Sequence, residues 1–562
     1  MTATIDFDVS LPEQCAQIWA ATRENAAAEK RLRQVPPVVR LWDGDMNLQY
    51  LVTAEYAASF EVVDSDTGPI EIRHPFDHPV GRWLYDMYGR LQRGEKRNVI
   101  ITCEYTGARI GGLLADCVLE LDGNGDQVII ASFASDYEQL KWYTVWSNPF
   151  LPAAVQFPRV FILPGPVTWV AATTLHLQLL RENLSLWALP DDPMNPATWG
   201  SLDQSNWPIV VTPLSFGQAM ASGVVWGIAS SRWKNYHDAM KAMLRDAEVT
   251  VVVRRYLDGD PDPWPGANIK HGALVVSFED KSGSFTGTAH GGTGFDGLAR
   301  TVEEFTADFI DTTTALVTDA AIPAEYYQPG SRLTKKELPF AVWLDGEETG
   351  LNSYRHKQTY GKGVQVLTGG HSMPGVNEAI SAGIQALGDI LGNLAQIGSI
   401  GGSVDTILKP FYEDTLLAWI SIKSLARAQN SGWVRYFEYF QDGSGKAYTL
   451  SSLMALRAGF FATRTFDAFE FDAGDGAPFL IGDQGDGHLW LGDRGGVGNI
   501  RGDKTGRIYI ERLSKLTLSW DRQTPVNWRP VFGDSRALQD PVAQANERLE
   551  SIKAAVQELG VS

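Results

Sequence analysis

Three aspartates, Asp258, Asp260 and Asp262, alternate in the stretch DGDPDPWPG, in the way that acidic ligands open a calcium-binding loop. Such a loop also needs glycine at its sixth position and a bidentate Glu at its twelfth, where this chain has Pro263 and Ile269. Each proline of the stretch fixes φ and removes a backbone donor. We therefore predict a stiff connection between two strands that binds no metal.

Two other short stretches have the spacing of binding sites but lack a required feature. His74 and His78 are spaced like metal ligands on a helix, yet the proline that follows each favours extended or turn backbone. GNIRGDKTG resembles a phosphate-binding loop, but Asp503 stands where the glycine before Lys504 is needed. We expect no metal or phosphate site at either place.

Catalytic motifs are also missing from the sequence. It contains no G-x-S-x-G, no H-E-x-x-H and no cysteine-centred nucleophile signature. Adjacent acids such as Glu303 and Glu304 point apart on a helix or strand, so they cannot form a glycosidase pair. We predict no catalytic, cofactor-binding or metal-binding residue. A hydrolase whose carboxylates meet only after folding remains an alternative.

The composition is that of a folded, acidic protein of several domains. The chain has 562 residues, of which 44% are hydrophobic, and a net charge of -19. This charge argues against nucleic acid or an anionic membrane surface as the main partner, because both need clustered Lys and Arg. Three cysteines without C-x-x-C spacing indicate synthesis in a reducing cytosol, and the first residues lack a secretory signal.

Two strand-rich blocks are predicted to form the framework. The first, 41–165, alternates apolar and polar residues and contains the turn DGNGD, which indicates an antiparallel sheet or barrel. In the second, 248–370, EVTVVVRRYL and GALVVSFED form a predicted hairpin, whereas 341–370 is expected to be irregular. Helices are expected after Pro166 and over 231–247, 301–319 and 411–429.

The stretch 379–400 is long enough to cross a bilayer but carries separate apolar and polar stripes. Its apolar stripe consists of Ile380, Ile384, Leu387, Leu391 and Leu394. We predict an amphipathic helix whose small residues permit close packing against a neighbouring backbone. Insertion into a membrane is the alternative.

A second predicted contact helix lies at the C-terminal end, with Asp540 as its N-cap and Gly560 as its stop. Its apolar residues follow a coiled-coil seam that includes Leu549, Ile552 and Val556. We predict self-association of this helix, and the alternative is a helix that packs on its own subunit.

Several segments, taken in order, resemble one protein family. They are GRWLYDM (81–87), YTGARIGGLL (105–114), VWSNPFLPAAVQFP (145–158), RYLDGDPDPWPGANIKHGALVV (255–276), APFLIGDQGDGHLWLGDR (477–494) and IYIERLSKLTLSWDR (508–522). Together they are similar to the minor tail proteins of siphophages that infect mycobacteria and other actinobacteria, which form the tail-tip hub.

The resemblance implies a structural protein of the virion tail tip, made in the host cytoplasm. It implies a homotrimer whose chains each contribute two tube-like β-barrels, so that six barrels face the sixfold tail. Expected partners are the distal tail protein, the tape measure protein and tip or fibre proteins, with possible host membrane contact during infection. The family offers no catalytic residues to carry over. The alternatives are a tail-associated cell-wall hydrolase and a membrane-active effector that uses residues 379–400.

The predicted fold class is α+β and multidomain. In chain order the predicted parts are an N-terminal arm (1–40), a first hub β-barrel region (41–165), a helical or mixed insertion (166–247), a second hub β-barrel region (248–370), a Gly-rich amphipathic helical hairpin (371–430), a mixed α/β domain (431–536) and a coiled-coil-like amphipathic helix (537–562).

Overall fold

The structure is a computed structural model that describes residues 6 and 8–533 with gaps. The long gaps are 282–309, 318–340, 370–418 and 442–454, and shorter ones lie elsewhere. The chain divides into two compact units. Unit 1 consists of Met1–Asp296, Thr314–Arg355 and Phe469–Asp534, and unit 2 of Gly297–Thr313, His356–Ala468 and Ser535–Ser562.

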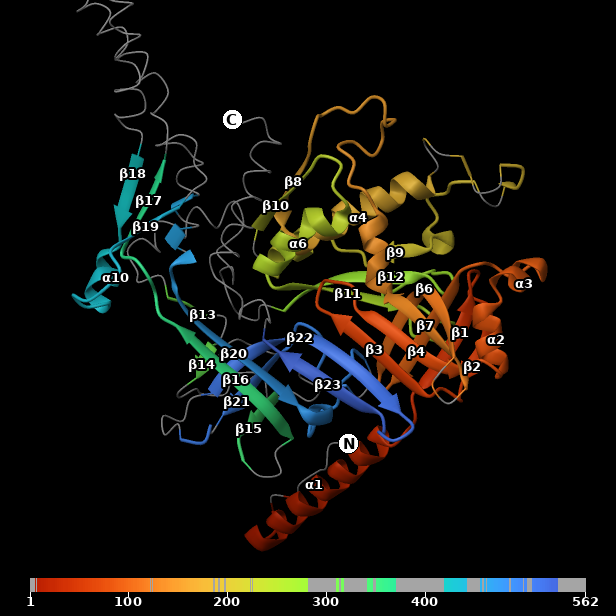
Figure 1. Cartoon of the computed structure of the whole chain (residues 1–562), viewed down its shortest axis with the longest axis horizontal. Coiled ribbons are helices and arrows are strands. Elements are labelled where there is room, and N and C mark those ends of the chain that lie inside the picture. The colour runs from red at the N-terminus through yellow and green to blue at the C-terminus, as the bar shows by residue number, and fades with distance from the viewer. Residues whose placement is uncertain are drawn as a thin grey trace, which may run out of the picture. The chain divides into compact units, whose positions relative to one another are not determined.

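The first part of unit 1 is a large, mostly antiparallel sheet with its flanking segments, which we call the sheet lobe (Figure 1). Its strands are β1 (Val38–Asp43), β2 (Leu48–Val52), β3 (Ala57–Val63), β4 (Pro69–Pro75), β5 (Val99–Tyr105), β6 (Ala108–Leu121), β7 (Gln127–Ser135), β14 (Ala315–Val317), β15 (Ala341–Leu344), β20 (Thr465–Ala473), β21 (Arg494–Gly498), β22 (Ile508–Asp521) and β23 (Asn527–Phe532). Two short helices, α2 (Pro79–Tyr85) and α3 (Met87–Gln92), follow β4.

Strand pairing in the sheet lobe does not follow the order of the predicted domains. The strand order runs β20-β23-β22-β3-β4-β7-β6-β5-β1-β2, and β22 pairs antiparallel with β3. Strands from 41–165 and 431–536 therefore share one sheet. Alternation of buried and exposed residues, as in β4, turns one set of side chains into a common core. In that core the rings of Phe471 and Phe532 stack with centroids 4.2 Å apart.

The second part of unit 1, which we call the helical lobe, follows β7. It contains η1 (Asp136–Trp142), β8 (Phe161–Pro166), α4 (Val167–Asn183), η3 (Gln204–Asn206), β9 (Ile209–Val211), α5 (Phe216–Ala221), β10 (Trp226–Ser231), α6 (Tyr236–Asp246), β11 (Val249–Arg255) and β12 (Leu274–Asp280). The expected helices are confirmed as α4 and α6, and the expected hairpin as the antiparallel pair β11–β12. The apolar stripe of α4 is fully buried, for example at Leu175 and Leu179.

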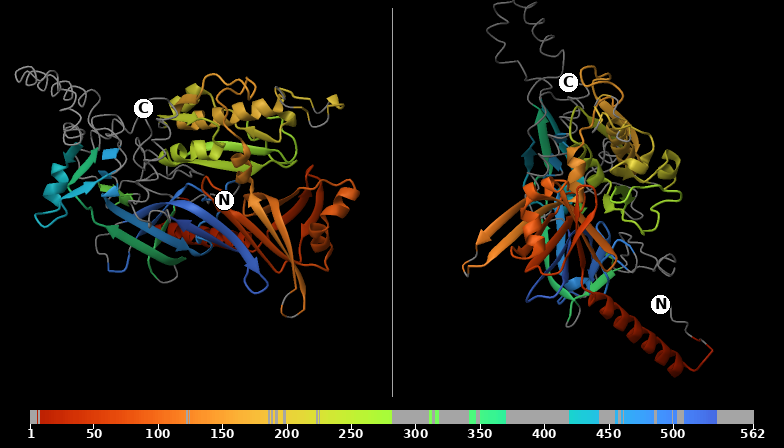
Figure 2. Two further views of the ribbon diagram at one scale, coloured as in Figure 1. Left: turned by 45° about the horizontal axis from the view of Figure 1, so that its top comes forward. Right: turned by 90° about the vertical axis from the view of Figure 1, so that its right-hand side faces the viewer.

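The N-terminal helix of unit 1 was not predicted. Helix α1 (Leu11–Arg33) begins with a capping box formed by Ser10 and Glu13 and projects from the strands (Figure 2). Its last residue is held at the sheet lobe, where Arg33 donates a hydrogen bond of 2.9 Å to the carbonyl oxygen of Phe479. The predicted N-terminal arm therefore contains a long helix, and the capping box was its local signal.

In unit 2 the structure describes a small sheet in the order β18-β17-β19. The elements of unit 2 are β13 (Ile310–Thr312), β17 (Gln365–Gly369), β18 (Trp419–Lys423), α10 (Leu425–Asn430) and β19 (Glu438–Phe440). Strand β16 (Leu351–Thr359) has residues in both units, and η5 (Gly474–Gly476) belongs to unit 1. Buried Arg427 of α10 donates to the carbonyl oxygen of Gly363 at 3.1 Å and to the hydroxyl of Thr463 at 2.9 Å, which ties the helix to this sheet.

Three secondary-structure predictions were wrong. The segment 301–319 was expected to be helical but contains the strands β13 and β14 where it is described. The segment 341–370 was expected to be irregular but contains β15, β16 and β17. The expected helix 411–429 is strand β18 over Trp419–Lys423 and helix α10 from Leu425 on, and residues 411–418 lie outside the described residues. In each case a distant pairing partner determines the strand, as for β15, which pairs in parallel with β21.

The fold class is therefore mixed α and β with a large antiparallel sheet, as predicted at that level. Among the helices that the structure describes, none has both the length and the apolar content needed to cross a membrane. The stretch 379–400, with Ile380, Ile384, Leu387, Leu391 and Leu394, lies outside the described residues, as do Leu549, Ile552 and Val556.

Candidate functional site: an ionic seam between two lobes

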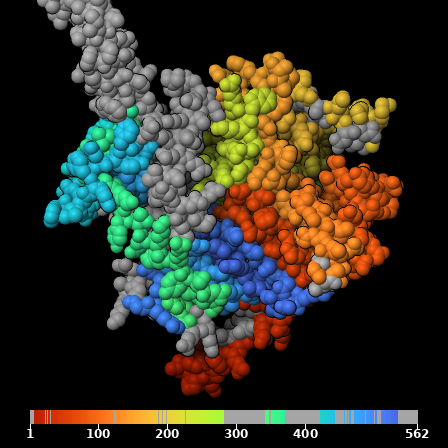
Figure 3. Space-filling model, viewed as in Figure 1, coloured from red at the N-terminus to blue at the C-terminus, as the bar shows by residue number. Residues whose placement is uncertain are grey.

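Among the described residues, ion pairs are concentrated where the helical lobe meets the sheet lobe. Six ion pairs cross this boundary, and we call their residues the ionic seam. They are Arg109–Asp260, Arg254–Asp483, Lys281–Asp493, Arg494–Glu248, Lys241–Asp66 and Lys141–Asp66. The space-filling view shows the helical lobe (orange to yellow-green) directly against the sheet lobe at this boundary (Figure 3).

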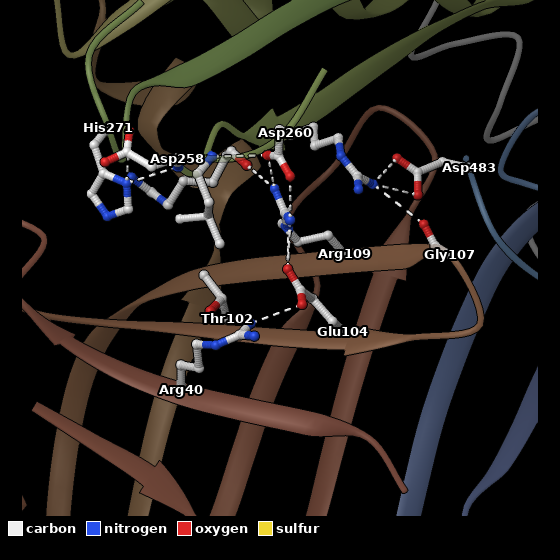
Figure 4. Close-up of polar contacts among 12 residues, drawn as sticks. Arg40, Thr102, Glu104, Gly107, Arg109, Asp258, Asp260, His271 and Asp483 are labelled. Atoms are coloured by element: carbon white, nitrogen blue, oxygen red, sulfur yellow. Dashed lines mark hydrogen bonds and ion pairs between the residues drawn. The ribbon is translucent and has the colours of Figure 1, made fainter. Parts of the chain in front are cut away.

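Arg109 on β6 is the centre of one part of the seam (Figure 4). It forms a two-pronged ion pair with Asp260, in the connection between β11 and β12, and donates to the carbonyl oxygen of Arg255 at 2.9 Å. Within its own lobe it donates to Glu104 at 2.7 Å, and Glu104 also accepts a hydrogen bond of 2.8 Å from Arg40. The planar guanidinium suits this use because its donors form a rigid fork.

Asp260, which belongs to the incomplete calcium motif, has the guanidinium of Arg109 as its partner. Asp260 also accepts a hydrogen bond of 2.9 Å from the backbone N–H of Leu257, which closes the turn after β11. Burial by itself raises the pKa of Asp260, but the hydrogen bonds from Arg109 and Leu257 outweigh it and lower the pKa below its usual value. The carboxylate is ionised at neutral pH and holds the two lobes together.

A cleft of about 440 Å³ lies beside this pair, between the polar face of β11–β12 and the segment 482–493. Arg254 reaches across to Asp483 at 2.6 Å, and Lys281 reaches Asp493 at 2.9 Å. Burial raises the pKa of both aspartates, and the facing cations oppose this rise. The cleft is therefore lined by charged groups that neutralise one another.

The other end of the seam is built around Asp66, in the turn between β3 and β4. It accepts from Lys141 of η1 at 2.9 Å and from Lys241 of α6 at 3.1 Å. Burial by itself raises the pKa of Asp66, but the hydrogen bonds from Lys141, the backbone N–H of Thr67 and Lys241 hold it well below its usual range. This turn is thereby fixed to two elements of the helical lobe.

A buried histidine extends this end of the seam into the helical lobe. Nε2 of His237 lies 3.2 Å from Nζ of Lys241, and Nδ1 lies 2.9 Å from the hydroxyl of Tyr137. Because a lysine ammonium can only donate, Nε2 accepts, and the ring proton of the neutral imidazole is on Nδ1 and is donated to Tyr137. Burial and the neighbouring Lys241 lower the pKa of His237, which agrees with a neutral ring.

The geometry of the seam favours a structural role over catalysis. Each seam carboxylate accepts from an Arg or Lys across the boundary, so within the seam no carboxylate pair is free to serve as general acid and base. No group of three or more potential metal ligands was found in the part of the chain that the structure describes. These ion pairs fix the orientation of one lobe on the other.

The structure brings His74 and His78 together, although not on one helix. His74 lies on β4 and His78 caps α2, and their rings are 4.8 Å apart. Nδ1 of His74 lies 3.1 Å from the carbonyl oxygen of Pro75, and Nδ1 of His78 accepts from the N–H of Val80. The ring of His78 is thus tied to the start of α2, and the ring of His74 to the end of β4.

Sequence reasoning missed the seam because its partners are far apart along the chain. Arg109 and Asp260 are separated by 151 residues, and Arg254 and Asp483 by 229. A local signal did exist. Arg254 and Arg255 follow directly on the apolar run VVV (251–253) in β11, and charged residues in a buried strand need partners.

Comparisons with known proteins agree with the resemblance seen in the sequence. The family described as Siphovirus ReqiPepy6 Gp37-like protein matches residues 38–534. Minor tail protein Gp28 of Mycobacterium phage L5 is 30% identical, over 98% of this chain and 98% of that protein. Minor tail protein Gp28 of Mycobacterium phage D29 is 29% identical over the same shares.

Two solved structures are similar over most of the chain at low identity. The tail protein from Neisseria meningitidis MC58 has a TM-score of 0.36 and 9% identity, over 91% of this chain and 99% of that chain. The E. coli c3393 protein, a component of the type VI secretion system, has a TM-score of 0.32 and 6% identity, over 86% and 74%. Because the family match covers residues 38–534, which include both lobes and the seam, this chain belongs to the siphovirus Gp37-like tail protein family.

Proposed function

We propose that this protein is a structural component of a bacteriophage tail tip. In this role it is a homotrimeric hub that joins the tail tube, through the distal tail and tape measure proteins, to the receptor-facing tip or fibre proteins. The observation that carries the proposal is the match to two proteins named minor tail proteins over 98% of this chain.

The arrangement of unit 1 supports a structural role. We propose two tube-like β-barrels per chain, in the regions 41–165 and 248–370, so that a trimer would present six to a sixfold tail. The ionic seam supports a structural role because its charged groups pair with one another and thereby orient the two lobes. Buried ion pairs add little net stability but impose a defined geometry.

The trimer contacts that we propose lie in two helices predicted from the sequence. The C-terminal helix would associate through Leu549, Ile552 and Val556. The stretch 379–400 would pack near the threefold axis through the stripe of Ile380, Ile384, Leu387, Leu391 and Leu394. A short coiled coil is weak by itself, so the body of the trimer has to bring its copies together.

The proposal is tested by the mass of the purified chain in solution together with its action on cell wall. Sedimentation should give three times the 61.8 kDa of one chain, and zymography on mycobacterial cell wall should give no cleared band. A monomer at micromolar concentration would contradict the trimeric hub. A cleared band that co-migrates with the chain would instead favour the tail-associated hydrolase, and binding to liposomes in flotation would favour the membrane-active effector.

A further inference from the structure

The two lobes of unit 1 have separate apolar cores. Among the apolar clusters that the described residues form, one contains residues of both lobes. In it, Trp42, Met46 and Ile100 of the sheet lobe pack with Leu257 of the helical lobe. Separating the lobes would therefore expose one small apolar cluster and leave both main cores intact.

The rest of the boundary is ionic and partly hollow. The six ion pairs of the seam cross it, and the cleft of about 440 Å³ lies within it. Arg512 adds a hydrogen bond of 2.6 Å to the hydroxyl of Thr250 on β11. Polar groups that leave such a boundary recover their hydration, whereas apolar groups that leave a core do not.

This difference determines how the boundary responds to perturbation. A complete buried ion pair contributes little net stability, because the cost of removing both charges from water offsets their attraction. A broken pair is strongly unfavourable, because it leaves one buried charge without a partner. Asp483 has 7% of its side chain exposed, so loss of Arg254 would leave such a charge. Opening the boundary would return it to water.

In the closed form, a glycine of each lobe nevertheless lies in close contact with a side chain of the other lobe. Gly272 of the helical lobe has φ of +82°, and an added Cβ would lie 2.1 Å from Cγ of Met46. Gly492 of the sheet lobe has φ of +84°, and its Cβ would lie 2.0 Å from Oγ1 of Thr250. The lobes thus have one well-defined closed arrangement, fixed by charge pairing and close backbone approach.

We propose that the ionic seam is a joint at which the two lobes separate as folded bodies. The open form exposes the polar face of β11–β12 and the acidic segment around Asp483 and Asp493. The inference goes beyond the proposed function, because it concerns an equilibrium within one chain and holds whether or not that chain forms a trimer.

The joint is tested with a distance measurement between the lobes. Spin labels are placed on cysteines that replace Leu121 of the sheet lobe and Leu202 of the helical lobe, which are both 70% exposed. Cys15 and Cys117 are replaced by serine, and Cys103 is buried and stays unlabelled. In the same samples, hydrogen exchange reports whether each core keeps its protection.

Three substitutions separate the joint from an ordinary loss of stability. Arg254→Met should increase the open population on the order of 100-fold or more, with both cores still protected. The double replacement Arg254→Met with Asp483→Leu should restore the closed distance, because it removes the unpaired charge. The control is Arg529→Met, which also removes the cation that pairs with a carboxylate, Asp472. Because both residues lie in the sheet lobe, this variant should leave the distance between the lobes unchanged.

The opposite results would overturn the proposal. An unchanged distance in Arg254→Met would show that the boundary does not open, and joint loss of protection in both cores would show one cooperative body. The wild-type chain gives an independent check in urea, where the labels should separate before either core loses protection. Coincident transitions would contradict the joint, whereas the trimeric hub is judged by the sedimentation experiment alone.

Discussion

Replacing Gly272 with alanine is expected to destabilise the closed form of unit 1 at the apolar contact between its lobes. The new Cβ would lie 2.1 Å from Cγ and 2.7 Å from Cβ of Met46, well inside van der Waals contact. Met46 is buried and belongs to the cluster with Trp42, Ile100 and Leu257, so its stem cannot move freely. Such overpacking costs about 1–3 kcal/mol.

The positive φ of Gly272 adds a second energetic cost to the alanine variant, and a control variant separates this cost from the clash with Met46. Gly272 has φ of +82°, and an alanine in this left-handed region costs about 1–2 kcal/mol. Gly94, in the turn after α3, has the same φ of +82° but nothing within 4 Å of its added Cβ. Gly94→Ala therefore carries the backbone cost alone, and the difference between the two variants measures the clash.

The assay is the urea-induced separation of the lobes, followed by the distance between spin labels on cysteines that replace Leu121 and Leu202. Gly272→Ala should lose about 1–3 kcal/mol more than Gly94→Ala in the first transition, with an unchanged dependence on urea concentration. Equal losses in the two variants would refute the reasoning, because they would show that the boundary accommodates a methyl group at Met46 without strain.

Three further predictions concern the seam, the core and the oligomer. Asp66 has a lowered folded pKa, so it stabilises the fold above the unfolded pKa of about 4, and this contribution is lost as the pH falls through the lower folded value. The urea midpoint of Asp66→Asn should therefore depend less steeply on pH below about 4 than that of wild type. Leu175→Ala, at a fully buried position of α4, should cost about 2–5 kcal/mol in urea denaturation, whereas Leu189→Ala, at an 84% exposed position, should cost almost nothing. Replacing Leu549 and Ile552 with Asp should lower the sedimentation mass, and an unchanged trimer would favour a helix packed on its own subunit.

Local periodicity was enough to predict the elements whose own sequence carries the signal. Helix α4 has its buried stripe at helical spacing, and the hairpin β11–β12 has two apolar runs joined by a proline-rich connection. Strand β15 was missed because its pairing partner β21 lies about 150 residues away, with Ala341 opposite Gly495. A four-residue apolar run carries no period that distinguishes a strand from irregular chain.

The ionic seam was beyond prediction from one sequence for a related reason. Charged residues are common, and nothing local indicates which carboxylate Arg109 will meet after folding. Asp260 belongs to an incomplete calcium motif, for which we predicted a stiff connection that binds no metal. Nothing in that motif indicates that its partner is a guanidinium from another lobe.

The central claim, a structural protein of the tail tip, is tested most directly on intact virions. Gold-labelled antibody raised against the purified chain should bind at the distal end of the tail in electron micrographs of the phage that encodes it. The control is the same antibody after adsorption with the purified chain, which should remove the label. Label along the tail shaft or on the head would contradict the account. Virions without label would also contradict it, if the chain is present in infected cells.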